Sequence, residues 1–533
     1  MRKNKKIALF IFLFFLKNFL SFAQDKGDAF VTGSIADARV LVPILASDSA
    51  SAQVCDFIFN GLLKYDKDLN LVPDLAESFE VSKDKKVITF HLKKGVKWHD
   101  GKEFTSEDVL FTYKMLVSPQ VPSPYSGDYE LIEKIETPDK YTVKVYYKKP
   151  FSPALSSWTM GIIPAHLLKG KNLLESDFKR RPVGTGPYKF CLWKTQEKII
   201  LKRNSDYFKK PPYIEYVVFK VIGDTATLFL ELITQNIDFA GLTPLQYIYH
   251  TKSSIFKKNF RKFEKPSLGY VYLGYNLRNP LFKDKRVRRA LNLAVNKKRI
   301  IKTVLLGKGI ICTGPFVPSQ WAFNPKIKPA PYDPERAKKI LKECGWQDAD
   351  SDGILEKDGK EFKFTIITNQ GNLERQKTAE LIKYDLEKIG IKVDIKVVEW
   401  SVFINEFINK RKFEAVLLGW GLSPEPDIYD IFHSSKTREG EFNFVGYKNK
   451  LVDKLLEKAR QIFDVKIRKK IYQKVQKIIY EDQPYMFLYV PQSLFALHKR
   501  FRNVKLTKSG IFYNFEEWYV PLKEQRYKLV IKE

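Results

Sequence analysis

The chain has 533 residues, more than a single hydrophobic core usually organises, so several domains are expected. Hydrophobic residues make up 44% and aromatic residues 14% of the sequence, which excludes an intrinsically disordered chain. The formal net charge is +31, but the basic residues are spread along the chain between acidic ones, which favours a solvated surface over a nucleic-acid-binding face.

The N-terminus carries the pattern of an export signal. Four basic residues precede an apolar run over residues 7–16: Arg2, Lys3, Lys5 and Lys6. Ser21-Phe22-Ala23 then offers a cleavage site, so residues 1–23 are predicted to be a cleavable signal peptide. A membrane anchor is the alternative, but the run is short and Lys17 interrupts it. The first cysteine is Cys55, so we expect a free periplasmic protein and no lipoprotein.

Residues 75–116 predict strands, a turn and a capped helix. Ile88, Phe90 and Leu92 alternate with more polar residues, as a strand with two different faces does. Asp100-Gly101 is a turn dipeptide. Thr105 and Asp108 form a capping-box pattern ahead of a helix whose apolar face is predicted to be Val109, Thr112, Tyr113 and Leu116.

Three later segments have equally clear local patterns. Residues 182–190 contain two glycines followed by a strand, which indicates a structural turn, because a phosphate loop would lead into a helix. Residues 279–296 predict a helix capped by Asp284. Residues 332–346 predict a helix with Asp333 as its N-cap, Pro334 as its first residue and Gly345 after its end.

Together these blocks resemble the family 5 extracellular solute-binding proteins, the receptors of peptide and nickel ABC importers, from about residue 38 to 519. The resemblance implies an α/β, bilobal, periplasmic-binding-protein-like fold of type II, with three domains and a hinged ligand cleft. By analogy, domain I is residues 24–62, 187–270 and 487–533; domain II is residues 63–186; domain III is residues 271–486.

The resemblance implies a monomeric receptor that captures an oligopeptide in the cleft and delivers it to an ABC transporter permease in the inner membrane. An oligosaccharide or a chelated metal such as nickel is the alternative ligand, and a hydrolase or a chaperone is the alternative class. The six histidines form no H-E-x-x-H, and no G-x-S-x-G occurs, so no enzyme is expected. No nucleic acid partner and no cofactor are expected, apart from calcium as described below.

The resemblance implies a cleft loop at residues 420–427, after a predicted buried strand at residues 413–418. Trp420 is predicted to form a wall of a ligand pocket, and Gly421 to let the ligand approach the backbone; a core tryptophan beside an ordinary turn is the alternative. Ser423 stands where peptide-binding relatives commonly have an aspartate for the ligand's amino terminus, and Glu425 or Asp427 could replace it. Asn369 stands near the position where dipeptide receptors carry an arginine, which argues against a strict dipeptide receptor.

Two further segments are candidate ligand contacts. Trp400 follows a strand and could pair with Trp420 around a peptide side chain or a sugar ring, or simply pack at a strand end. Ser47, Asp48 and Ser49 correspond to a segment of domain I that contacts ligands in the family. Asp48 could bind a ligand cation or merely cap a helix that starts near Ser49.

Residues 348–354 begin like a calcium-binding loop. Asp348, Asp350 and Asp352 have the D-x-D-x-D-G spacing, but Gly359 stands where the twelfth-position acid belongs. A possible structural calcium site is therefore weighed against a polar surface turn.

The four cysteines, Cys55, Cys191, Cys312 and Cys344, include no C-x-x-C pair, which excludes the common zinc and redox motifs. Export permits disulfides, and four cysteines allow three pairings between which the sequence does not choose. Cys344 falls on the predicted buried stripe of its helix, which favours a packed thiol.

Overall fold

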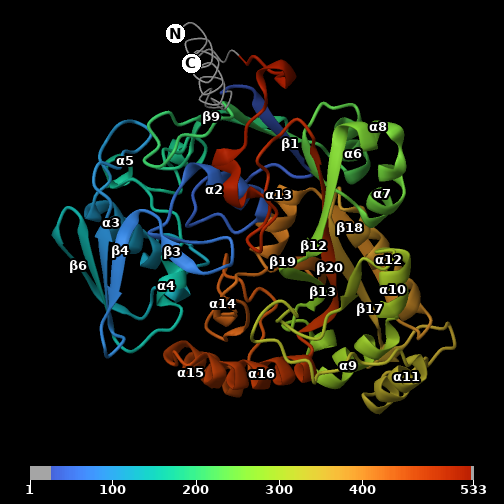
Figure 1. The fold of residues 1–533 in the computed structure, drawn as a ribbon. Helices are drawn as coiled ribbons and strands as arrows, with labels where there is room; N and C mark the ends of the chain where they lie inside the picture. The colour runs from blue at the N-terminus through green and yellow to red at the C-terminus, as the bar shows by residue number, and fades with distance from the viewer. Residues whose placement is uncertain (1–25, 530–533) are drawn as a thin grey trace, which may run out of the picture.

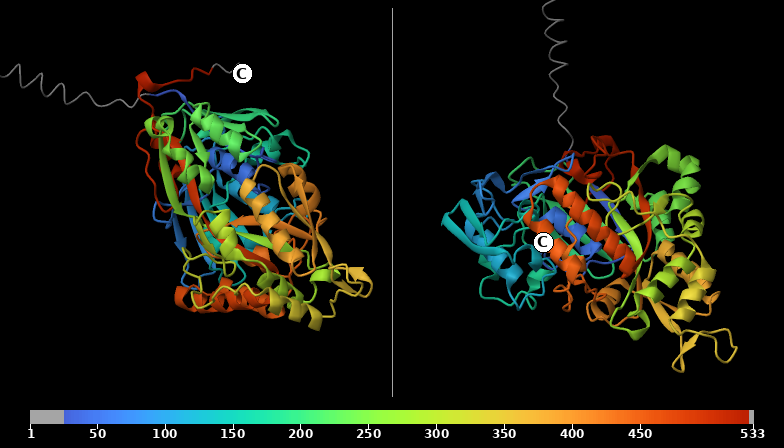
Figure 2. Two further views of the ribbon diagram at one scale, coloured as in Figure 1. Left: turned by 90° about the vertical axis from the view of Figure 1, so that its right-hand side faces the viewer. Right: turned by 90° about the horizontal axis from the view of Figure 1, so that it is seen from below.

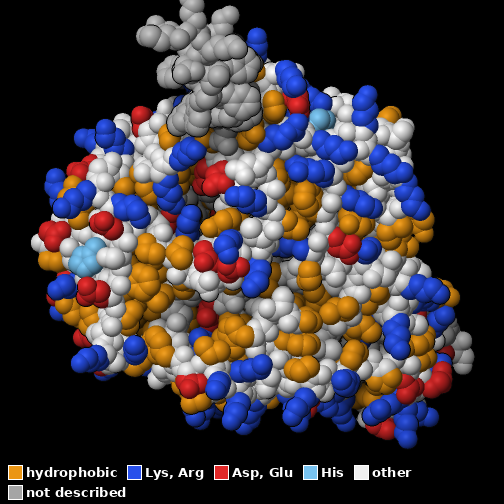
Figure 3. Space-filling model, viewed as in Figure 1, with side chains coloured by type: hydrophobic (Ala, Val, Ile, Leu, Met, Phe, Trp, Pro, Cys, Tyr) orange, Lys and Arg blue, Asp and Glu red, His pale blue; other side chains and the backbone are white. Residues whose placement is uncertain are grey.

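The computed structural model describes residues 26–529, so the predicted signal peptide lies outside the described residues. The chain forms two α/β lobes (Figures 1 and 2). In the described part of the chain, no helix is long and apolar enough to cross a membrane. Lys and Arg side chains are scattered between Asp and Glu over the face seen in Figure 3, as the solvated-surface interpretation predicts.

One large sheet runs through both lobes, in the order β18-β17-β19-β13-β20-β11-β1-β10-β9-β8. Its strands on one side of β20 (Tyr485–His498) are β18 (Lys392–Val398), β17 (Lys363–Asn369), β19 (Ala415–Gly421) and β13 (Gly269–Tyr275). On the other side are β11 (Phe239–Gly241), β1 (Ala29–Ser34), β10 (Tyr216–Val221), β9 (Lys198–Arg203) and β8 (Tyr188–Lys194). Two more strands, β12 (Phe260–Pro266) and β14 (Gly309–Ile311), also pair with β20.

β20 changes partners halfway along its length. Its first half, from Tyr485 to Tyr489, pairs with β13, and its second half, from residue 492 to 498, pairs with β12. The chain passes from β12 to β13 beside this point, where the Ser267 amide donates to the Pro491 carbonyl at 3.2 Å. We call residues 26–267 and 491–529 lobe 1 and residues 268–490 lobe 2; the predicted three-domain boundaries stay a prediction.

The predicted block 75–116 forms part of a small sheet of lobe 1 and its covering helix. The sheet order is β4 (Ala76–Val81), β5 (Val87–Leu92), β7 (Thr142–Tyr147) and β6 (Ile132–Asp139). In β5 the alternate residues Ile88, Phe90 and Leu92 are buried, and helix α3 (Ser106–Val117) begins with the predicted capping box. Both local predictions are confirmed.

The other predicted helices also form. Helix α9 (Lys285–Ala294) is capped by Asp284, and α11 (Pro334–Glu343) is capped by Asp333. Gly184 and Gly186 lie against the backbone of Ile58, where an added Cβ would lie 1.9 Å and 2.6 Å from its carbonyl oxygen, so this turn is structural as predicted.

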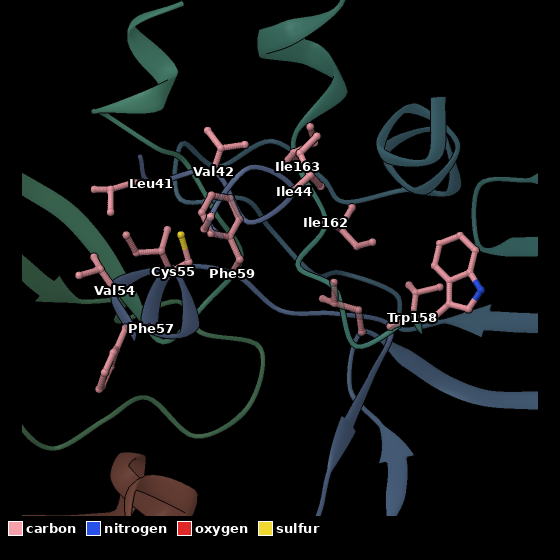
Figure 4. Close-up of a cluster of buried hydrophobic side chains, with 14 of the residues drawn as sticks. Leu41, Val42, Ile44, Val54, Cys55, Phe57, Phe59, Trp158, Ile162 and Ile163 are labelled. Carbon is pink, nitrogen blue, oxygen red and sulfur yellow. The ribbon is translucent and has the colours of Figure 1, made fainter. Parts of the chain in front are cut away.

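Further helices cover the two lobes. In lobe 1 they are α2 (Ser49–Ile58), α4 (Ala154–Ser157), α5 (Ala165–Leu168), α6 (Thr225–Ile233), α7 (Pro244–Ile248) and α8 (Ser254–Asn259). In lobe 2 they are α10 (Lys297–Thr303), α12 (Leu373–Glu387), α13 (Trp400–Val402), α14 (Tyr429–Phe432), α15 (Lys450–Gln461) and α16 (Val465–Asp482). Figure 4 shows the core of lobe 1 where α2 packs: Cys55 points toward the side chains around Val42, whereas the Phe57 ring points the opposite way from the helix. Cys55, Cys312 and Cys344 are buried free thiols, which agrees with the packed thiol predicted for Cys344.

A buried ion cluster ties the C-terminal segment to the sheet of lobe 1. The Arg500 side chain, only 2% exposed, donates from Nε to Asp238 Oδ1 at 2.8 Å and from Nη2 to Asp238 Oδ2 at 2.7 Å. It also pairs with Asp28 and donates to the Ala29 carbonyl at 2.7 Å. Removing this arginine would leave two buried carboxylates without a counter-charge.

We therefore predict that Arg500→Met lowers the free energy of unfolding by about 3–5 kcal/mol. Urea denaturation followed by circular dichroism measures the change. Arg286→Met is the matched control, since Arg286 and its partner Asp284 are largely exposed and the substitution should have little effect. Equal losses in the two variants would contradict the prediction.

Candidate functional site

A cavity of about 580 Å³ lies between the lobes, next to the point where the chain passes from one to the other. Ser267, Gly269 and Pro491 line it at this crossing. Lobe 1 adds the segment 46–49 and Tyr125, and lobe 2 adds five larger side chains, Arg375, Trp400, Trp420, Phe442 and Phe444. The volume falls within the range of roughly 300–1,000 Å³ that is usual for small-molecule sites.

Trp420 is both a cavity wall and a packed residue. It is the next-to-last residue of β19 and lies directly opposite Tyr270 of β13. Its Nε1 donates to Tyr485 Oη at 3.3 Å, and its ring packs edge-on against Phe442 at 5.3 Å between centroids. Gly421 follows with open space at its Cα, as its predicted role requires. These contacts fix the orientation of the indole where it lines the cavity.

Trp400 and Asp48 meet across the cavity. Trp400 Nε1 of lobe 2 donates to Asp48 Oδ1 of lobe 1 at 3.3 Å. Asp48 also caps α2, where it accepts from the Ser51 amide at 3.0 Å, and it pairs with Arg39 at 3.5 Å. The structure thus shows the helix-capping alternative for Asp48, whose oxygens are already used by protein donors. Ser47 and Ser49 line the cavity beside it.

Asn369, which the sequence predicts to contact the ligand, is buried and does not line the main cavity. It supports Arg375, which does line this cavity. Its Oδ1 accepts from Arg375 Nη1 at 2.7 Å, and Arg375 lies in the first turn of α12. Nη2 of this arginine packs close to Gly419, where an added Cβ would lie 3.1 Å away. The Arg375 Nε is buried without a hydrogen-bond partner, so the guanidinium keeps an unused donor. Arg375 was not among the residues predicted from the sequence. The one signal in the sequence was that Arg375 lies six positions after Asn369.

A second cavity of about 320 Å³ shares Ala46, Ala52 and Tyr125 with the main one and is acidic. The predicted residues Ser423 and Asp427 line this second cavity. Its other acidic residues are Asp56, Asp128, Glu425 and Asp430, and Arg460 is its basic residue. Asp427 Oδ2 accepts from Arg460 Nε at 2.7 Å, and Glu425 pairs with Arg468, so both proposed substitutes for the missing aspartate are bound to arginines.

Burial controls the protonation of this acidic cavity. It raises the pKa of Glu425 to about 7, against the opposing effect of Arg468. It raises the pKa of Asp128 to about 6, against the opposing effect of Arg460, and that of Asp56 to about 6. Carboxylates without enough counter-charges in a low dielectric bind protons more strongly.

The candidate calcium loop is assembled as its spacing suggests. Carboxylate oxygens of Asp348, Asp350 and Asp352 lie within 4.8 Å of one another, and Glu356 joins them in place of the missing twelfth-position acid. Asp348 Oδ2 accepts from the Gly353 amide at 3.0 Å, which curls the loop. The donors are all carboxylates, the ligand type that calcium prefers. Calcium binding stays a prediction, and none of these four acidic residues lines either cavity.

The chain is similar to known proteins over most of its length. Residues 70–440 match the family described as bacterial extracellular solute-binding proteins, family 5 Middle. The chain is 38% identical over 509 residues to the oligopeptide-binding protein AppA of Bacillus subtilis, covering 93% of this chain and 92% of AppA.

Two solved structures are similar over nearly their whole length. One is AppA from Bacillus subtilis in complex with a nonapeptide, with a TM-score of 0.89 and 36% identity, covering 93% of this chain and 100% of that one. The other is NikZ from Campylobacter jejuni in complex with Ni(L-His), with a TM-score of 0.84 and 29% identity, covering 92% and 99%. With an α/β bilobal fold of type II and a cavity between its lobes, this chain belongs to the bacterial extracellular solute-binding proteins of family 5.

Proposed function

We propose that this chain captures an oligopeptide between its lobes and delivers it to the permease of an ABC importer. The observation that carries this proposal is the 580 Å³ cavity, which both lobes line beside their connection. A ligand that contacts both lobes stabilises the closed arrangement, because those contacts are incomplete when the lobes separate. A permease can then distinguish the closed protein from the open one by its shape.

The lining of the cavity suits a peptide of variable sequence. Trp400, Trp420 and Phe442 offer aromatic surfaces that accept different side chains. Arg375 offers a guanidinium donor to a carboxylate or a peptide carbonyl. The nonapeptide bound by the similar AppA supports an oligopeptide as the ligand class.

A chelated metal is the second candidate, favoured by the similarity to NikZ in complex with Ni(L-His). None of the six histidines lines either cavity within the described residues, so a metal would have to arrive with its own chelator. Arg375 could then bind a carboxylate of that chelator. An oligosaccharide stacked on Trp400 and Trp420 has no support from these comparisons.

The same proposal includes a cellular location and an oligomeric state. Relatives are extracellular solute-binding proteins, and this chain is therefore an exported binding protein. We propose that the signal peptide is cleaved after Ala23 and that the mature protein is a periplasmic monomer without a lipid anchor. We also propose that it has no catalytic activity, as its relatives are named for binding.

Trp420→Ala is expected to weaken oligopeptide binding about tenfold or more, because an aromatic wall of the cavity is lost. The peptide is first identified by native mass spectrometry of the purified protein, and affinity is then measured by calorimetry. Trp193→Ala is the matched control, since Trp193 lies on β8 and lines neither cavity. Unchanged peptide affinity in a folded Trp420→Ala protein would show that Trp420 does not contribute to peptide binding.

Arg375 is expected to bind a carboxylate of the ligand. Amidation of the peptide's C-terminus should then lower the affinity of the wild-type protein by about tenfold or more, because a charge-assisted hydrogen bond is lost. Arg375→Met should bind both forms of the peptide equally. An amidation effect of the same size in both proteins would place the carboxylate elsewhere.

Calcium is expected to bind the loop 348–356 with a dissociation constant of about 0.1–1 mM, the range of extracellular calcium modules. Calorimetric titration with Ca²⁺ measures this, and the double variant Asp350→Asn/Asp352→Asn should abolish the signal. Asp358→Asn, just outside the cluster, is the control. If the wild type and both variants gave identical titrations, the loop would be a surface turn that does not bind calcium.

A further inference from the structure

The lobes also touch at a place other than their strand connection and the main cavity. Here the C-terminal end of α15 and Lys436, both of lobe 2, reach the segment 126–130 and Ser152 of lobe 1. In Figure 1 this contact lies where α15 passes below α4, which begins two residues after Ser152. No residue predicted from the sequence to bind the ligand takes part in these cross-lobe contacts.

Lobe 1 caps a helix of lobe 2 at this contact. The Ser152 amide donates to the Arg460 carbonyl at 2.6 Å, and Ser152 Oγ donates to the Ala459 carbonyl at 3.2 Å. Both carbonyls belong to the last turn of α15, where a helix cannot satisfy its own acceptors. Separation of the lobes removes these two donors.

Arg460 connects the two lobes through its guanidinium. Nη1 donates to the Gly127 carbonyl at 2.8 Å, and Nη2 donates to Asp128 Oδ1 at 2.8 Å, both in lobe 1. Within lobe 2 the same group donates to Asp427 and lies 3.8 Å from the ring centroid of Tyr429. Arg460 is only 3% exposed. Because its own lobe already orients it, closure adds two charge-assisted bonds at little cost in side-chain entropy.

Lys436 makes a parallel connection. Its Nζ pairs with Glu130 and lies 3.5 Å from Ser126 Oγ, and its side chain is 1% exposed. The two lobes approach so closely here that a Cβ added to Gly127 would lie 2.2 Å from Asp430 Oδ1 and 2.8 Å from Lys436 Cε. A side chain at position 127 would therefore displace Asp430 and Lys436 from their present positions.

We propose that these contacts form an interlobe latch, made by Gly127, Asp128, Glu130 and Ser152 of lobe 1 with Lys436 and Arg460 of lobe 2. The latch uses protein atoms alone, so it populates the closed arrangement even before a ligand binds. Contacts that exist only in the closed arrangement raise its population by their net free energy. Every ligand that needs closure gains the same factor in affinity, and this consequence for ligands rests on the proposed function.

Two kinds of variant test the latch. Asp128→Asn/Glu130→Gln removes both charges on lobe 1, whereas Gly127→Ala places a methyl group between the lobes and changes no charge. Both should give a larger radius of gyration than the wild type in small-angle X-ray scattering of the peptide-free protein. Glu77→Gln/Glu80→Gln, with the same charge change on exposed positions of β4, is the matched control and should match the wild type.

Affinity measurements separate closure from ligand contact. Gly127→Ala should lower the affinity for two oligopeptides of unrelated sequence by the same factor, about tenfold. The reason is that the substitution lowers the population of the closed arrangement, which both peptides need. A radius of gyration equal to that of the wild type in both folded latch variants would overturn the latch, and so would a loss confined to one peptide. If no peptide binds the wild type, the peptide proposal fails, and the peptide-free scattering still decides the latch.

Discussion

The arrangement of the two lobes depends on one strand connection. β20 runs through both lobes, and the chain returns beside it from β12 to β13, so residues 266–269 and 490–492 lie next to each other. Two adjacent extended segments allow rotation of the lobes without breaking the ladders on either side. The main cavity lies at this connection, because Ser267, Gly269 and Pro491 form part of its wall. The main cavity therefore adjoins the two segments about which the lobes would rotate.

The two cavities differ in chemistry. The main cavity has aromatic walls and one guanidinium with an unused donor. In the acidic cavity next to it, Asp427 pairs with Arg460 and Glu425 pairs with Arg468, whereas no described residue forms an ion pair that neutralises Asp56. The same Arg460 reaches across to Asp128. Trp420 of the main cavity and Asp427, which orients Arg460, thus lie close together in one segment of lobe 2.

Several residues have two roles that a sequence pattern cannot separate. Trp420 packs against Phe442 and also lines the cavity, while its contact with a ligand stays a prediction. Asp48 also lines the cavity, but its oxygens cap α2 and pair with Arg39. Burying a carboxylate is costly unless its oxygens accept hydrogen bonds, and for Asp48 the protein itself supplies the donors. Proximity to a cavity is therefore weaker evidence of ligand binding than an unused donor or acceptor.

The sequence by itself determined the local elements, the family and the loops that face the cleft. Alternation in β5, the caps of α3, α9 and α11, and the turn at Gly184 all depend on neighbours a few residues apart, which the sequence displays directly. Only the tertiary structure decided which polar groups are used and which are left over. Arg375 is a site residue because Asn369 and Gly419 place it, and Asp128 meets Arg460 across 332 positions of sequence. Such pairings follow from how the lobes pack, and no periodicity along the chain records them.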